Sequence, residues 1–178
     1  MLATPLLVGI LASGPSWIHL PLTAFWFLGY FAFFATGIWL KAKRRERHRP
    51  PVLAYGSAAA VAGLLTLVLQ PDLIRWAPLF AVPLGVGLVA SALRDERSLW
   101  SGLSTTVGSS LMTLVAYDAG GGSDFPRAWL LAAVIATYFA GTVFYVKTLI
   151  RERGSEPYYW LSVGFHALAT LAVIPFAP

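Results

Sequence analysis

The chain has 178 residues, of which 57% are hydrophobic and 12% are charged, and its formal net charge is +5. A soluble domain usually carries about twice that charged fraction, so we expect lipid rather than water to cover most of its surface. The absence of cysteine excludes disulfides and thiolate metal sites. The basic residues lie between apolar segments, a pattern typical of membrane proteins and not of nucleic-acid-binding proteins.

Apolar segments follow one another along the whole chain. A helix of about 20 residues crosses the roughly 30 Å hydrocarbon core of a bilayer, so residues 1–13 predict only a partial helix. Six full spans are predicted at 17–40, 52–69, 76–93, 98–117, 128–151 and 157–176. The sequence therefore predicts an all-α fold, a single polytopic transmembrane helical bundle over residues 1–178.

Basic residues are divided unevenly between alternate connections. All lysines and arginines except Arg75 and Arg127 lie in or beside the loops 41–51, 94–97 and 151–156. The positive-inside rule predicts that these three loops are cytoplasmic, in a bacterial inner membrane, and that the C-terminus is outside. Anionic lipid headgroups are the expected partners of residues 41–49. A second copy of the chain or another membrane protein is a further expected partner.

Polar residues recur at steps of three and four on the last two predicted helices, along one face of each. They are Tyr138, Thr142 and Tyr145 on the first helix, and Ser162 and His166 on the second. A tight hairpin pairs positions whose numbers sum to about 308, which places Thr142 level with His166. Two interpretations remain open. These groups hold the helices together by hydrogen bonds, or His166 is a proton carrier or ligand contact, because ionisable groups inside a membrane are costly.

Two charged turns on the predicted cytoplasmic side form a second candidate site. Its members are Arg94, Asp95, Glu96, Arg97, Arg151, Glu152 and Arg153. Each turn is either solvated and self-neutralising or part of a site that, with the basic run 41–49, binds an anionic headgroup or phosphate. The three histidines are dispersed along the chain, and no metal or cofactor site is predicted.

Five segments, taken in order, carry a family resemblance. They are WLKAKRRERHRPPVLAY (39–55), RDERSLWSGL (94–103), LVAYD (114–118), AGTVFYVKTLIRERGS (140–155) and YYWLSVGFHAL (158–168). From about residue 17 to the C-terminus the chain resembles the YwiC-like family of uncharacterised bacterial membrane proteins. The resemblance implies a membrane location but no established reaction, and hence no catalytic residues. Family members characteristically begin with a His-Gly-Ala-Trp segment, which this chain lacks, so we interpret Met1 as lying inside the family's first helix.

Three functions are compatible with these patterns. The favoured one is a non-catalytic membrane component that binds partners or lipid, because no recognisable catalytic set is present. The second is a small ion-coupled transporter that uses His166, with Pro78, Pro83, Gly85 and Gly87 bending one helix at a binding site. The third is a membrane enzyme acting on a lipid or isoprenoid phosphate at the cytoplasmic face, although the chain has only eight acidic residues and no aspartate-rich metal motif.

Overall fold

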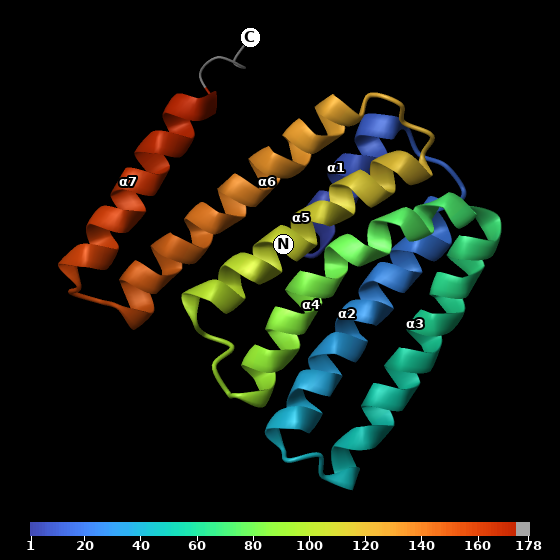
Figure 1. Ribbon diagram of the computed structural model, residues 1–178, viewed down its shortest axis with the longest axis horizontal. Helices are drawn as coiled ribbons and strands as arrows, with labels where there is room; N and C mark the ends of the chain where they lie inside the picture. Colours follow the sequence, from blue (N-terminus) through green and yellow to red (C-terminus); the bar gives the residue numbers. More distant parts are fainter. Residues whose placement is uncertain (174–178) are drawn as a thin grey trace.

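The computed structural model describes residues 1–173, apart from the side chains of Arg151 and Val173. Within that range the chain is entirely helical, as predicted, and has seven α-helices and no strand (Figure 1). The helices are α1 (Ala3–Ser13), α2 (His19–Lys41), α3 (Arg49–Leu69), α4 (Ala77–Ala92), α5 (Leu99–Ala119), α6 (Phe125–Val146) and α7 (Glu156–Val173). Two 3₁₀ helices, Glu46–His48 and Pro71–Trp76, precede α3 and α4, and a π-helical turn, Lys147–Arg151, extends α6.

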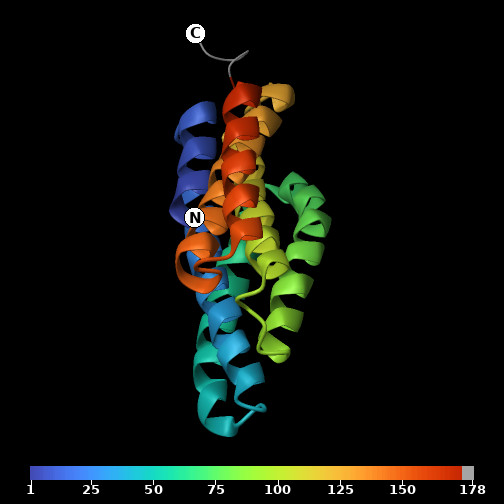
Figure 2. The ribbon, with the colours of Figure 1, turned by 90° about the vertical axis from the view of Figure 1, so that its left-hand side faces the viewer.

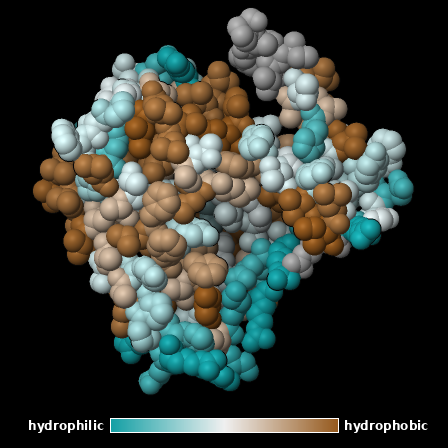
Figure 3. Space-filling model, turned by 180° about the vertical axis from the view of Figure 1, so that it is seen from behind, coloured by the Kyte–Doolittle hydropathy of each residue, from teal (hydrophilic) through white to brown (hydrophobic). Residues whose placement is uncertain are grey.

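Successive helices run in opposite directions, so their connections alternate between two ends of the bundle (Figure 1). The turns at 42–48, 93–98 and 152–155 lie at one end, which we call the basic end. The turns at 14–18, 70–76 and 120–124 lie at the other, which we call the opposite end. Hydrophilic residues gather at the bottom of Figure 3, where the α2–α3 connection lies, and hydrophobic residues cover much of the flanks.

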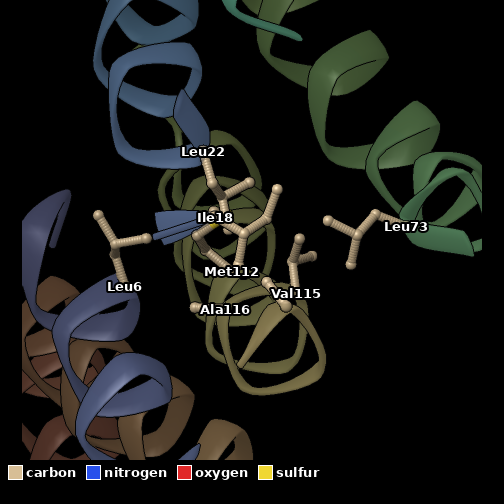
Figure 4. Close-up of a cluster of buried hydrophobic side chains, with 8 residues drawn as sticks. Leu6, Ile18, Leu22, Leu73, Met112, Val115 and Ala116 are labelled. Atoms are coloured by element: carbon tan, nitrogen blue, oxygen red, sulfur yellow. The ribbon is translucent and has the colours of Figure 1, made fainter. Parts of the chain in front are cut away.

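Helix α5 is the centre of the bundle. It packs against α1, α4 and α6, with α1 and α4 on opposite sides of it (Figure 2). Every residue from Met112 to Ala119 is buried. Around Met112 and Val115 lie Leu6 of α1, Leu22 of α2 and Leu73 of the 3₁₀ helix, which together form the main apolar cluster (Figure 4). The helix that is least apolar by sequence is therefore the one with the most protein around it.

The small and hydroxyl residues of α5 explain how this helix can be surrounded by other helices at the centre of the bundle. Thr106 Oγ1 donates to Gly102 O at 3.0 Å and Ser110 Oγ donates to Thr106 O at 2.9 Å, so these two buried hydroxyls bond within their own helix. Gly108 allows Pro83 of α4 to approach so closely that an added Cβ would lie 2.8 Å from the Cβ of the proline. Small residues of this kind let helix backbones pack closely inside a membrane.

The prediction of six full spans is not supported. Within residues 1–173, four helical segments are long and apolar enough to cross a membrane: His19–Lys41, Glu46–Leu69, Pro71–Ala92 and Phe125–Ile150. Of the predicted spans, 98–117 corresponds to α5, which is not among the four because its buried faces carry serine, threonine and glycine in place of lipid-facing apolar residues. Helix α7 is not among them either, and the predicted span 157–176, like the predicted outside C-terminus, runs beyond the described residues.

Candidate functional site

The hairpin of α6 and α7 carries the first predicted set of polar residues. Phe144 and Phe165 pack with their ring centroids 4.9 Å apart, and Thr148 Oγ1 donates to Tyr158 O at 3.2 Å. His166 faces Gly141, where an added Cβ would lie 2.9 Å from the imidazole Nε2. The sums of these paired positions lie close to 308, the register that the sequence predicts for the hairpin.

The five predicted residues of this hairpin are only partly brought together. His166 Nδ1 donates to Ser162 O at 2.7 Å, and Thr142 Oγ1 donates to Tyr138 O at 3.1 Å, so both bonds stay within one helix. Tyr138 and Tyr145 are 70% and 55% exposed and point away from the protein interior. The geometry thus leaves the Nε2 atom of His166 beside α6, while the two tyrosines lie on the outer surface.

An ion pair at the basic end joins two connections. Lys41 Nζ lies 2.7 Å from Glu96 Oε2, and Ser91 Oγ donates to Glu96 Oε1 at 2.8 Å. The hydrogen bond from Lys41, together with that from Ser91 and the nearby charge of Arg97, lowers the pKa of Glu96 below its ordinary value of 4.5. The carboxylate therefore stays ionised at neutral pH and ties the end of α2 to the α4–α5 turn.

The rest of the turn at 94–97 is also used in structural contacts. Arg94, whose φ of 60° places it in the left-handed region, donates from Nη2 to Lys41 O at 3.1 Å. Trp100 Nε1 donates to Asp95 Oδ2 at 3.2 Å. Both acids of this turn thus have partners within the protein itself.

The second charged turn remains separate from the first. Glu152 is half-buried and Arg153 is exposed, whereas the side chain of Arg151 lies outside the described residues. Among the described side chains, no hydrogen bond or ion pair joins the 152–153 segment to the turn at 94–97. The two halves of the predicted anion site are therefore not brought together by direct contact.

The loop between α2 and α3 holds the densest basic cluster. Lys43, Arg44, Arg45, Arg47 and Arg49 are all exposed there. Lys43 and Arg44 adopt positive φ values of 54° and 58°, and the guanidinium of Arg44 lies 5.9 Å from the centroid of the Trp39 ring. Arg45, Arg47 and Arg49 have ordinary backbone conformations, and Glu46 is the one acid of the loop. This loop has the densest positive charge at the basic end.

A polar cluster at the opposite end was missed by the sequence interpretation, which ended the predicted span at residue 117, just before Asp118. Asp118 belongs to the last turn of α5 and is 8% exposed. Its Oδ1 lies 2.6 Å from Arg75 Nη2, and its Oδ2 accepts a hydrogen bond from Trp76 Nε1 at 2.7 Å. The guanidinium of Arg75 also lies over the rings of Trp76 and Phe125. The sequence did contain a signal for this cluster: charged residues are few at this end, so an acid and a base there are expected to pair with each other.

His19 lies buried at the same end, with both ring nitrogens bonded. The backbone N–H of Ser16 donates to Nδ1 at 2.9 Å, so Nε2 carries the proton and donates to Ala116 O at 2.9 Å. This residue joins the start of α2 to α5. Its geometry is that of a structural contact between the two helices.

The four apolar helices indicate a membrane protein, and its fold is an all-helical bundle built around α5. The chain belongs to the YwiC-like family: the family model described as "YwiC-like protein" matches residues 1–117, which confirms the resemblance. An uncharacterised protein of Haemophilus influenzae is 27% identical over 175 residues, covering 98% of this chain and 73% of that protein. The uncharacterised protein YwiC of Bacillus subtilis is 27% identical over 169 residues, covering 94% of this chain and 70% of that protein. No solved structure matches the chain.

Proposed function

We propose that the protein is a non-catalytic, multi-pass component of the bacterial cytoplasmic membrane whose basic end faces the cytoplasm and binds anionic phospholipid headgroups. The observation that carries this proposal is the exposed basic loop 43–49 at the end where nearly all the lysines and arginines gather. Positive residues near the cytoplasmic surface attract anionic lipid with about 1 kcal/mol each. The bacterial source of the relatives supports the bacterial part of this proposal.

The packing of the bundle also supports a component that binds lipid or another membrane protein. In the most apolar part of each of the segments His19–Lys41, Glu46–Leu69 and Pro71–Ala92 only 17% of the residues are buried, so most of their apolar surface is open to lipid or to another membrane helix. Helix α7 makes its main contacts with α6 and the π-helical turn, and Leu168 and Leu171 on it are 69% and 62% exposed. A second copy of the chain or a membrane partner has an available apolar surface there.

The transporter and enzyme interpretations receive less support. Helix α4 runs unbroken from Ala77 to Ala92, and its unusual residues have packing roles: Pro83 contacts Gly108, and Gly87 makes room for Phe33 of α2. The acids Asp95 and Glu96 make structural contacts with Trp100 and Lys41, and the chain has no aspartate-rich metal motif. The carrier alternative keeps one supporting observation, which is that the Nε2 atom of His166 on α7 lies beside Gly141 of α6.

The headgroup test uses native mass spectrometry of the detergent-purified protein mixed with equal amounts of dioleoyl phosphatidylglycerol and dioleoyl phosphatidylcholine. We expect the chain to retain phosphatidylglycerol in preference to phosphatidylcholine. A triple variant, Arg45→Gln, Arg47→Gln and Arg49→Gln, should weaken that retention by roughly tenfold or more, because each basic residue contributes about 1 kcal/mol.

The control carries Arg127→Gln, which removes an exposed arginine at the opposite end and should leave the preference unchanged. Equal retention of the two lipids by the natural chain, or unchanged retention by the triple variant, would contradict the proposal.

A further inference from the structure

A groove opens between α2 and α3 next to the basic loop. Its volume is about 530 Å³, and its wall is largely aromatic. The principal lining residues are Tyr30, Phe31 and Phe34 of α2, Pro51 and Tyr55 of α3, and His48 of the connecting 3₁₀ helix. Phe31 and Tyr55 face each other across the two helices with ring centroids 5.4 Å apart. The groove therefore has an apolar floor and one polar mouth.

The depth of the groove matches one leaflet of a bilayer. Tyr30 lies 11 residues before Lys41, the last residue of α2, which corresponds to about 16 Å along the helix axis. Half of the roughly 30 Å hydrocarbon core is about 15 Å. The aromatic side chains of Phe31 and Phe34 are 43% and 56% exposed, so they have free surface for a ligand. An acyl chain that enters at the basic end would end near Tyr30.

The mouth of the groove is positively charged. His48 lines it, and Arg47 Nε donates to His48 Nε2 at 3.0 Å, which places that guanidinium beside the opening. Helix α3 begins at Arg49 and has no acidic residue in its first turn, so the positive end of its dipole adds to the two arginines. Glu46 is exposed in the same loop and is outnumbered by the surrounding basic residues. The opening thus complements an anion while the interior complements a hydrocarbon chain.

We propose that this groove binds one acyl chain of an anionic phospholipid, whose headgroup phosphate is held at the mouth by Arg47 and Arg49. The inference rests on the proposed function, since it places the basic end at the cytoplasmic leaflet, and it adds a defined chain site to the general attraction of headgroups. The combination of an apolar floor of one leaflet's depth with a basic mouth selects a phospholipid over a free anion, which would contact only the mouth.

The first test compares the binding of phosphatidylglycerol with dioleoyl chains, phosphatidylglycerol with dihexanoyl chains, and inorganic phosphate by native mass spectrometry. We expect one dioleoyl lipid to be retained at least about tenfold more strongly than the short-chain lipid. The double variant Phe31→Ala, Phe34→Ala should lose most of this chain-length preference and keep its preference for phosphatidylglycerol over phosphatidylcholine. The matched control Leu64→Ala, Val68→Ala alters exposed apolar residues of α3 outside the groove and should behave like the natural chain.

The outcomes separate the two proposals. Chain-length-independent binding with a retained headgroup preference would overturn the groove and leave the headgroup function standing. Loss of the headgroup preference in the natural chain would overturn both. Displacement of the lipid by equimolar inorganic phosphate would identify a free-anion site and overturn the groove.

A second measurement on the unaltered protein keeps the proposal testable if the variants fold poorly. Phosphatidylglycerol with a photoreactive diazirine on its acyl chain is incorporated with the protein into nanodiscs, irradiated and mapped by peptide mass spectrometry. We expect adducts concentrated on residues 30–38 and 51–55. Adducts spread evenly over the lipid-facing helices, or concentrated on α6 and α7, would contradict an acyl-chain site between α2 and α3.

Discussion

Replacing Asp118 by alanine is expected to destabilise the protein by about 2–3 kcal/mol, because hydrogen bonds to a charged group contribute about that much and both partners would be left without it. Asp118 accepts from Trp76 Nε1 and pairs with Arg75, so one buried carboxylate attaches the 3₁₀ helix Pro71–Trp76 to the end of α5. The loss stays below the cost of a fully buried broken pair, since the side chain of Arg75 is 52% exposed and can reach water.

The measurement is the midpoint of thermal unfolding in detergent, for Asp118→Ala and Asp118→Asn. The asparagine keeps one oxygen acceptor and should lie between the natural protein and the alanine variant. Asp72→Ala is the matched control, because Asp72 is an exposed aspartate at the same end and its removal should change the midpoint little. Equal shifts for the Asp118→Ala and Asp72→Ala variants would show that the buried cluster does not stabilise the fold.

Substituting Gly9 by alanine is the second change with a large expected effect. An added Cβ would lie 2.7 Å from the Cβ of Ala116 and 2.5 Å from the carbonyl oxygen of Thr113, so α1 would have to move away from the backbone of α5. Overpacking of this kind costs about 1–3 kcal/mol, although alanine favours a helix over glycine by about 1 kcal/mol. We expect a net loss of stability and a looser α1.

Limited proteolysis in detergent reads this effect directly, since a displaced α1 should be cleaved near residue 14 much faster than in the natural protein. The matched control is Gly56→Ala in α3, where an added Cβ meets nothing within 4 Å. That variant should be neutral or slightly stabilised because only the helix propensity changes. If Gly9→Ala were as resistant to protease as Gly56→Ala, the close packing of α1 on α5 would be wrong.

The helical fold and the alternation of its connections could be predicted because both depend on local features: long apolar runs, glycine and proline at turns, and basic residues in every second loop. The number of membrane-crossing helices could not be predicted in this way. The serines, threonines and glycines of α5 are compatible with a span or with a helix enclosed by protein, and that choice depends on which neighbours α1, α4 and α6 supply.

The polar sites likewise include contacts that follow from local sequence and contacts that depend on which helices are neighbours. The register of the α6–α7 hairpin follows from the short turn: the sequence predicts Thr142 level with His166, and the structure places His166 against the adjacent Gly141. The pairing of Asp118 with Arg75, and of Lys41 with Glu96, joins residues 43 and 55 positions apart. Such contacts depend on which helices are neighbours, and a single sequence does not contain that information. The groove between α2 and α3 likewise appears only when Phe31 and Tyr55 face each other.

The central claim is that the chain crosses the membrane with its basic end in the cytoplasm, and labelling of single cysteines tests it most directly. The natural chain has no cysteine, so Glu46→Cys at the basic end and Ser123→Cys at the opposite end each provide one exposed thiol. In intact spheroplasts, a membrane-impermeant maleimide should label Ser123→Cys at once and Glu46→Cys only after permeabilisation. Labelling of both thiols from the outside, or of Glu46→Cys alone, would contradict the account.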